Sequence, residues 1–143
     1  MRFEDFIKKG LAKRSSKDMQ LAKSLMSAAE QDMAFLKPLP LNESSARKIV
    51  SNYYDVLRSL LEADASLNGF KVYSHEAFTY YLIENKEEAL SVKFERVRKI
   101  RNSINYYGKT IGVEEAEDTI NEIAHIIDKI KSRLREKSKV DEK

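Results

Sequence analysis

The stretch NESSARKIVSNYYDVLRSLLEADASLN, residues 42–68, decides the fold of this chain. Its apolar side chains recur at alternating steps of four and three, which places them on one face of an α-helix. These side chains are Ala46, Val50, Tyr53, Leu57, Leu60 and Leu67. Asn42 is a good N-cap and Gly69 a good C-terminal stop, so we expect one unbroken helix between them. Such a helix predicts the central member of a helical bundle.

Amphipathic segments on both sides of this stretch predict the helices that pack against it. Apolar residues recur at helical steps over four further segments: residues 16–35, 75–84, 90–107 and 113–135. Pro38 and Pro40 stop the first of these helices and make the next connection extended. No segment shows the two-residue alternation of a strand. The sequence therefore predicts an all-α fold, an antiparallel up-down bundle of four main helices with short additional helices.

The chain is long enough for one domain with a single core, since it has 143 residues. Within it we expect three parts. Residues 1–16 form a basic, amphipathic N-terminal lead that docks on the bundle or contacts a partner, nucleic acid or a membrane surface. Residues 17–136 form the bundle, and residues 137–143 form a charged tail that we expect to fray.

The composition excludes several kinds of function. There is no cysteine, so disulfides, thiolate catalysis and cysteine zinc sites are excluded. Only two histidines are present, His75 and His125, and no tight carboxylate motif accompanies them, so we expect neither a metal site nor a cofactor. No apolar run approaches the roughly 20 residues of a membrane span, and the start lacks the apolar core of a signal peptide. We therefore expect a cytoplasmic protein without a membrane partner.

Polar side chains suited to chemistry gather in the segment RVRKIRNSINYYGK, residues 96–109. Arg101 falls in the apolar stripe of its helix, and Asp64 falls in the apolar stripe of the central helix. A buried charge needs a partner, so we expect Asp64 and Arg101 to meet across the core. This pair is either structural or orients Arg101 for a ligand. The neighbouring face of the same helix carries three further polar residues, Asn102, Asn105 and Tyr106.

Positive charge is concentrated in the same part of the chain. From Lys93 to Lys109 there are six basic residues against one acid, so this segment can attract a phosphate backbone. The candidate nucleic-acid contacts are Arg96, Arg98, Lys99, Arg101 and Lys109. The alternative interpretation is that the run is an ordinary solvated helix face.

Three short motifs resemble those of the HEPN superfamily. They are Asn52-Tyr53-Tyr54 in the central helix, Tyr73-Ser74-His75 at the start of the next helix, and Arg101-Asn102 near a helix end. The resemblance covers residues 17–134 and implies a small helical bundle that forms homodimers. Many HEPN proteins are metal-independent ribonucleases of toxin–antitoxin, defence or RNA-processing systems, whereas others bind only nucleotides or partner proteins.

The HEPN signature is an arginine, often followed by asparagine, with a histidine after four to six further residues. Arg101 and Asn102 match its beginning, whereas Tyr106 stands at the histidine position. Tyrosine has a reference pKa of about 10, against about 6.5 for histidine, so it is a poor base at neutral pH. The candidate catalytic residues are Arg101, Asn102 and Tyr106, with Asp64, Asn105 and His75 as supporting residues.

Two classes of function follow from these observations. One is a homodimeric binding or regulatory bundle whose Arg101-Asn102-Tyr106 cleft holds RNA, a nucleotide or a partner protein. The other is a metal-independent endoribonuclease in which Tyr106 or His75 replaces the missing histidine. The resemblance also implies a partner, since HEPN toxins often pair with a nucleotidyltransferase-type antitoxin. A structural bundle without a ligand and an unrelated helical adaptor stay open as alternatives.

Overall fold

Helices make up most of the structure, a computed structural model that describes residues 1–141, with side chains through residue 138. The helices are α1 Phe3–Lys8, α2 Met19–Leu36, α3 Ala46–Leu67, α4 His75–Glu84, α5 Glu88–Tyr107 and α6 Val113–Asp141. Two short strands accompany them, β1 Ala12–Arg14 and β2 Phe70–Val72. The predicted all-α bundle is confirmed. None of the helices within residues 1–141 combines the length and the apolar character needed to cross a membrane.

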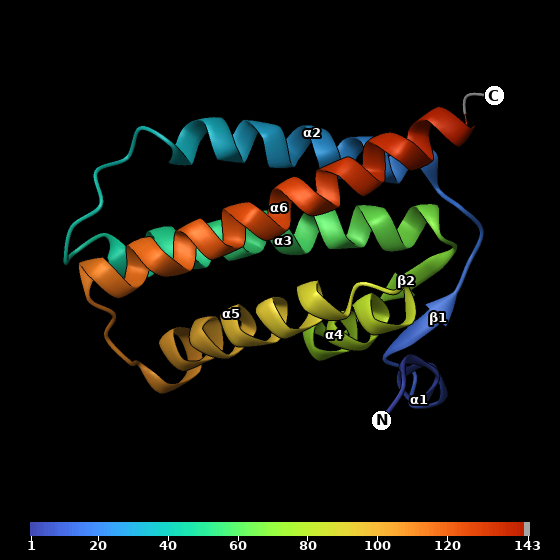
Figure 1. Cartoon of the computed structure of the whole chain (residues 1–143), viewed down its shortest axis with the longest axis horizontal. Helices are drawn as coiled ribbons and strands as arrows, with labels where there is room; N and C mark the ends of the chain where they lie inside the picture. Colours follow the sequence, from blue (N-terminus) through green and yellow to red (C-terminus); the bar gives the residue numbers. More distant parts are fainter. Residues whose placement is uncertain (142–143) are drawn as a thin grey trace.

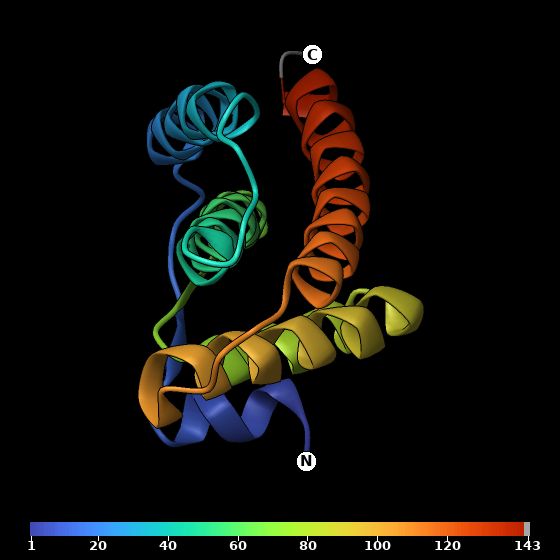
Figure 2. The same cartoon turned by 90° about the vertical axis from the view of Figure 1, so that its left-hand side faces the viewer.

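The long helix α3 lies at the centre of the bundle (Figure 1). Chain direction reverses from α2 to α3 and again from α5 to α6, so the long helices run up and down (Figure 1). Viewed end-on, α2, α6 and the layer of α4 and α5 surround α3 on three sides (Figure 2). Within residues 1–141 no helix covers the remaining flank of α3 (Figure 2). That flank carries the polar side chains of α3, whereas its other faces are buried.

The helix ends follow local capping chemistry. The Asp18 carboxylate accepts a hydrogen bond from the backbone N–H of Leu21 at 2.9 Å, so α2 begins after Asp18 rather than after Ser16. The Asn42 side chain accepts from the backbone N–H groups of the next turn, and α3 itself begins at Ala46. Gly108 ends α5 with a φ of 63°, as its position in the sequence predicts.

A very small two-stranded sheet accompanies the helices, which no alternation in the sequence indicated. Strand β1 pairs antiparallel with β2, with Ala12 opposite Val72 and Arg14 opposite Phe70. Segments of three residues are too short for a two-residue alternation to be visible in the sequence. This pairing attaches the N-terminal lead to the bundle, where Phe3 and Phe6 are buried against an aromatic group. That group consists of Phe70, Tyr80 and Tyr81.

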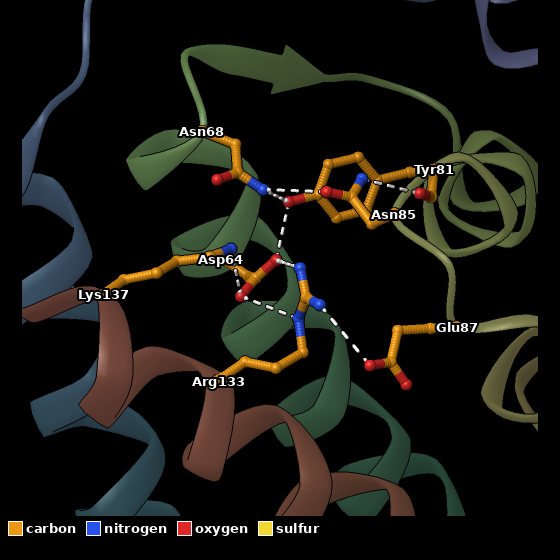
Figure 3. A network of polar contacts seen from close by, with 7 residues as sticks. All are labelled: Asp64, Asn68, Tyr81, Asn85, Glu87, Arg133 and Lys137. Carbon is orange, nitrogen blue, oxygen red and sulfur yellow. Dashed lines mark hydrogen bonds and ion pairs between the residues drawn. The ribbon is translucent and has the colours of Figure 1, made fainter.

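The predicted pair between Asp64 and Arg101 is wrong. Asp64 is fully buried and binds residues of α6 and α4 instead (Figure 3). Arg133 donates two hydrogen bonds to its carboxylate, at 3.1 and 3.3 Å, and Lys137 Nζ lies 2.7 Å from Oδ1. The Tyr81 hydroxyl donates a third bond at 2.6 Å. We call Asp64, Tyr81, Arg133 and Lys137 the Asp64 network.

The Asp64 network also changes the picture of the C-terminal tail. Lys137, expected to begin a frayed tail, is anchored to the most deeply buried carboxylate of α3. Helix α6 continues to Asp141, and residues 142 and 143 lie outside the described residues. Arg133 and Lys137 of α6 therefore serve packing, because a buried carboxylate requires cationic partners.

Candidate functional site

Helices α3 and α5 lie side by side and bring their polar residues into register. The Ser51 hydroxyl donates a hydrogen bond to Asn105 Oδ1 at 3.0 Å. One turn along, Arg101 Nη2 lies 3.5 Å from Asp55 Oδ1. Because the helices are antiparallel, moving one turn forward on α3 corresponds to moving one turn back on α5. We call this row of polar contacts, which borders the uncovered flank of α3, the α3–α5 seam.

Arg101 is largely buried in the seam yet only loosely partnered. Its side chain is 14% exposed, and its guanidinium carbon lies 5.3 Å from the centre of the Tyr54 ring. Such a distance permits a cation–π contact. Asp55, its carboxylate partner, is 45% exposed and makes a contact at the limit of a hydrogen bond. Among the described residues Arg101 Nε is buried and has no hydrogen-bond partner. A partly buried guanidinium in this state can accept a further anionic partner.

His75 approaches the seam through the same tyrosine. The Tyr54 hydroxyl lies 3.2 Å from His75 Nδ1, so the buried ring of Tyr54 contacts both His75 and Arg101. Burial lowers the pKa of His75 below its ordinary value, and the nearby guanidinium groups of Arg58 and Arg101 lower it further. Burial raises the pKa of Tyr54, so its phenol stays protonated. His75 is therefore a neutral imidazole at neutral pH, able to accept a proton.

Two other arginines near His75 already have carboxylate partners. Arg58 donates to Glu62 at 3.0 Å within α3. Arg98 binds Glu95 one turn away within α5, and Glu95 also accepts a hydrogen bond of 2.6 Å from Thr79. These pairs occupy much of the hydrogen-bonding capacity of Arg58 and Arg98. Of the three arginines near His75, Arg101 is therefore the one with the most hydrogen-bonding capacity left for a ligand.

Beside the C-terminal end of α5, where the seam ends, the protein surface forms a polar cleft of about 530 Å³. Its lining residues are Arg47, Lys48, Ser51, Asn52, Ile104, Asn105 and Tyr106. None of these lining residues is acidic. The Tyr106 ring is 71% exposed, and Arg47, Lys48 and Asn52 are exposed as well. We call this hollow the Asn105 cleft.

The structure brings some of the predicted site residues together and separates others. Asn105 and Tyr106 line the Asn105 cleft, and Arg101 lies one turn away on α5 beside Tyr54 and His75. Asn102, between them, is half-buried. Asp64 does not support Arg101, because it belongs to the network with α6.

The predicted basic residues also fall into two groups, those paired with a glutamate and those that are exposed. Arg98 is held by Glu95, and Arg96 forms an ion pair with Glu122 of α6. Lys99 is exposed at 4.0 Å from Glu95. Lys109 is exposed just beyond the end of α5, in a smaller hollow beside Lys99. The available positive charge in this region therefore comes from Arg101, Lys99 and Lys109 and from the two α3 cations of the cleft.

Sequence reasoning missed the contribution of α3 to the site. The residues that it did not name are Arg47, Lys48, Ser51, Asp55 and Arg58, whereas Asn52 and Tyr54 were named only as part of a HEPN-like motif and not as site candidates. A signal for most of them was present, because polar residues recur every three or four positions along the face of α3 opposite its apolar stripe. Their partners on α5 could not be assigned, because the register between two helices is set by packing rather than by either sequence segment.

Comparison of the chain with protein-family models and with curated proteins gives no match. The chemistry of the site therefore has to be inferred from its own residues. Within the described part of the chain, no group of three or more histidine, aspartate and glutamate side chains is placed to hold a metal ion. The fold and the site together define a small all-α bundle with a polar, partly cationic seam between its central helix and α5.

Proposed function

We propose that this protein is a HEPN-like binding or regulatory bundle that holds single-stranded RNA or a nucleotide along the α3–α5 seam and acts as a homodimer. The Asn105 cleft is the observation that carries this proposal. It combines two exposed cations, three amide or hydroxyl side chains and an exposed tyrosine, without a lining acid. These are the groups that single-stranded nucleic acid requires: cations for phosphate, an aromatic ring for stacking and amides for base edges.

Arg101 adjoins the Asn105 cleft along α5. Asn105 and Arg101 are one helical turn apart, about 6 Å along α5. A base stacked on Tyr106 would therefore place an adjoining phosphate near Arg101, Arg47 or Lys48. Ser51 holds the Asn105 oxygen, which leaves the Asn105 amide nitrogen to donate to a ligand.

The first test of this proposal is binding of a fluorescein-labelled single-stranded RNA, measured by fluorescence anisotropy. Tyr106→Ala should weaken binding by about 1–3 kcal/mol if the ring stacks on a base. Lys48→Gln should lower the slope of log affinity against log salt by roughly 0.7, the value for one phosphate contact with a single strand. Lys129→Gln, which removes an exposed lysine of α6, is the matched control and should change neither quantity. Equal effects of Lys48→Gln and Lys129→Gln would reject the cleft as the binding site.

The dimer is a separate part of the proposal and has its own test. An isologous interface would bring two copies of the seam near a two-fold axis. Light scattering at high protein concentration should give twice the mass of one chain, and a monomer would remove the dimer from the proposal. A nucleotidyltransferase encoded beside this protein would support the toxin–antitoxin version, with that enzyme as the partner.

A second function, metal-independent RNA cleavage, is favoured by one specific observation. Tyr54 contacts both His75 and Arg101, so a neutral imidazole and a guanidinium adjoin the same tyrosine. In that reaction His75 would take the 2′-hydroxyl proton, and the 2′-oxygen would attack phosphorus to form a 2′,3′-cyclic phosphate. The bond between phosphorus and the 5′-oxygen would break, and the 5′-oxygen would leave as an alcohol after taking a proton from water. Arg101 would stabilise the negative charge that develops on the phosphate. Tyr106, the other candidate to replace the missing histidine, lines the Asn105 cleft instead and is 71% exposed.

Cleavage is tested with the purified protein and single-stranded RNA in EDTA. The ribonuclease proposal predicts fragments ending in a 2′,3′-cyclic phosphate, lost in both His75→Gln and Arg101→Gln. RNA that binds and stays intact would leave the binding function and reject the catalytic one. Fragments that persist in both variants would come from a contaminating nuclease and would also reject it.

A further inference from the structure

We propose that the His75 end of the α3–α5 seam is a binding site for a phosphate monoester, with Arg101 as its guanidinium contact and His75 taking up a proton when the ligand binds. The terminal phosphate of a nucleotide or of an RNA end is the ligand class. This inference rests on the proposed function, because it specifies which phosphate the seam prefers. It concerns Arg101, Tyr54 and His75 rather than the Asn105 cleft.

The geometry of the three side chains carries the proposal. The fully buried Tyr54 side chain contacts both other residues, with the Arg101 guanidinium carbon 5.3 Å from its ring centre and His75 Nδ1 3.2 Å from its hydroxyl. The buried Nε of Arg101 is without a partner among the described residues, and the carboxylate of Asp55 is at 3.5 Å. A phosphate oxygen offers Arg101 a closer charge-assisted hydrogen bond than Asp55 does.

The charges around His75 explain why a proton accompanies the ligand. From α3 it faces Arg58, with its partner Glu62, and the more exposed Asp55. From α5 it faces Arg101 and Arg98, the latter bound to Glu95. Its own helix contributes the exposed Glu76, the next residue. Protonation of His75 in the free protein would add a positive charge beside three guanidinium groups, and their repulsion opposes it. The negative charge of a bound phosphate would offset this repulsion.

The same reasoning favours a monoester over a diester. A phosphate monoester carries a charge of about −1.5 to −2 near neutral pH, whereas a diester within an RNA chain carries only one negative charge. A dianion can therefore stabilise both Arg101 and a protonated His75. The Tyr54 hydroxyl permits this change, because it can donate to Nδ1 of a neutral imidazole and accept from Nδ1–H of a protonated one.

The experiment uses the fact that the chain has only two histidines. The imidazole proton resonances of His75 and His125 are followed by NMR between about pH 5 and pH 8, with and without adenosine 5′-monophosphate. The spectrum of His75→Gln assigns the two signals. The dinucleotide ApA, which has a diester and no terminal phosphate, is the matched control ligand. Sulfate, a dianion at every pH used, separates the protonation of His75 from that of the nucleotide phosphate.

Adenosine 5′-monophosphate and sulfate should each raise the His75 pKa by about 1 unit or more and leave that of His125 unchanged. By linkage, sulfate should then bind roughly tenfold more weakly for each pH unit of increase between the free and bound pKa values of His75. Arg101→Gln should abolish the shift in a protein that remains folded by its NMR spectrum.

The possible failures are distinct. An unchanged His75 pKa under saturating nucleotide, while RNA still binds at Tyr106, would overturn the phosphate site and leave the proposed function standing. An equal shift with ApA would overturn the preference for a monoester. Absence of binding by RNA, nucleotide and sulfate alike would overturn this inference together with the proposed function.

Discussion

Replacing Asp64 by asparagine should destabilise the protein more than any change at the seam. Asp64 is completely buried, and Arg133, Lys137 and Tyr81 all bind its carboxylate (Figure 3). Asparagine preserves the shape and can still accept a hydrogen bond from Tyr81. Among the side chains described through residue 138, Asp64 is the one carboxylate that contacts both cations, and Asp64→Asn removes its charge, although Glu87 remains 3.5 Å from Arg133.

The size of the effect follows from the burial of the partners. Removing one member of a buried ion pair typically costs 3–5 kcal/mol, because the remaining charge stays desolvated. Arg133 and Lys137 are not completely buried, since their side chains are 19% and 22% exposed. They can therefore regain some hydration, and we expect a loss near the lower limit, about 3 kcal/mol.

Urea unfolding followed by circular dichroism measures this loss as a change in the free energy of unfolding. Asp55→Asn is the matched control, because it removes the same charge from the same helix at a side chain that is 45% exposed. That variant should lose no more than about 1 kcal/mol. A loss in Asp64→Asn no larger than in Asp55→Asn would refute the conclusion that the Asp64 network holds α6 on α3.

The pH dependence of the same variant provides an internal check. Burial alone would raise the pKa of Asp64, but Lys137, Arg133 and Tyr81 together lower it. A carboxyl group with a lowered folded-state pKa contributes stability above its unfolded pKa of about 3.9 and loses that contribution as the pH falls through the folded value. The difference between the wild type and Asp64→Asn should therefore be constant near neutral pH and shrink below about pH 4.

Three further predictions concern the rest of the fold. Gly108→Ala should cost about 1 kcal/mol in urea unfolding, because Gly108 has a φ of 63° and an added Cβ would meet no neighbour, so only the backbone is strained. An unchanged midpoint would contradict this. Arg96→Ala should change stability by less than about 1 kcal/mol, since Arg96 is mostly exposed in its pair with Glu122; a larger loss would show that the pair is structural. Deleting residues 1–14 should lower the melting temperature clearly, because α1 buries two phenylalanines. Burial of each contributes about 1.5–3 kcal/mol to the free energy of unfolding. An unaltered melting curve would show that the lead is only loosely docked.

The helices could be predicted because their signals are local. Apolar periodicity and the glycine that ends α5, Gly108, lie within the segments that they describe, whereas α2 and α3 begin a few residues later than expected, after Asp18 and Ser45. The β1–β2 pair was missed for the opposite reason. It joins residues about 60 positions apart through three-residue strands, and neither strand has a recognisable pattern of its own.

The partner of Asp64 was predicted wrongly because burial of a charge does not reveal its partner. Asp64 lies near the C-terminal end of α3, and Arg101 lies in the C-terminal half of α5. Antiparallel helices place the end of one beside the start of the other, so the two residues lie on different levels of the bundle. Helix α6 runs in the same direction as α3 (Figure 1). Arg133 and Lys137, near its C-terminal end, therefore reach Asp64 (Figure 3).

The candidate site was only partly predictable for a related reason. The α5 residues Arg101, Asn105 and Tyr106 stood out because they share one polar face of one helix. The contributions of Tyr54 and His75 depend on how α3, α4 and α5 pack, and this packing brings the tyrosine hydroxyl to the imidazole.

The central claim, that the α3–α5 seam binds nucleic acid, is tested most directly by NMR on the ¹⁵N-labelled protein with a short single-stranded RNA that carries a 5′-phosphate. The account predicts chemical-shift changes at Ser51, Asn52, Arg101, Asn105 and Tyr106, and none around Lys129 on α6. Changes confined to α2 and α6, or a spectrum unaffected by saturating RNA at low salt, would contradict it.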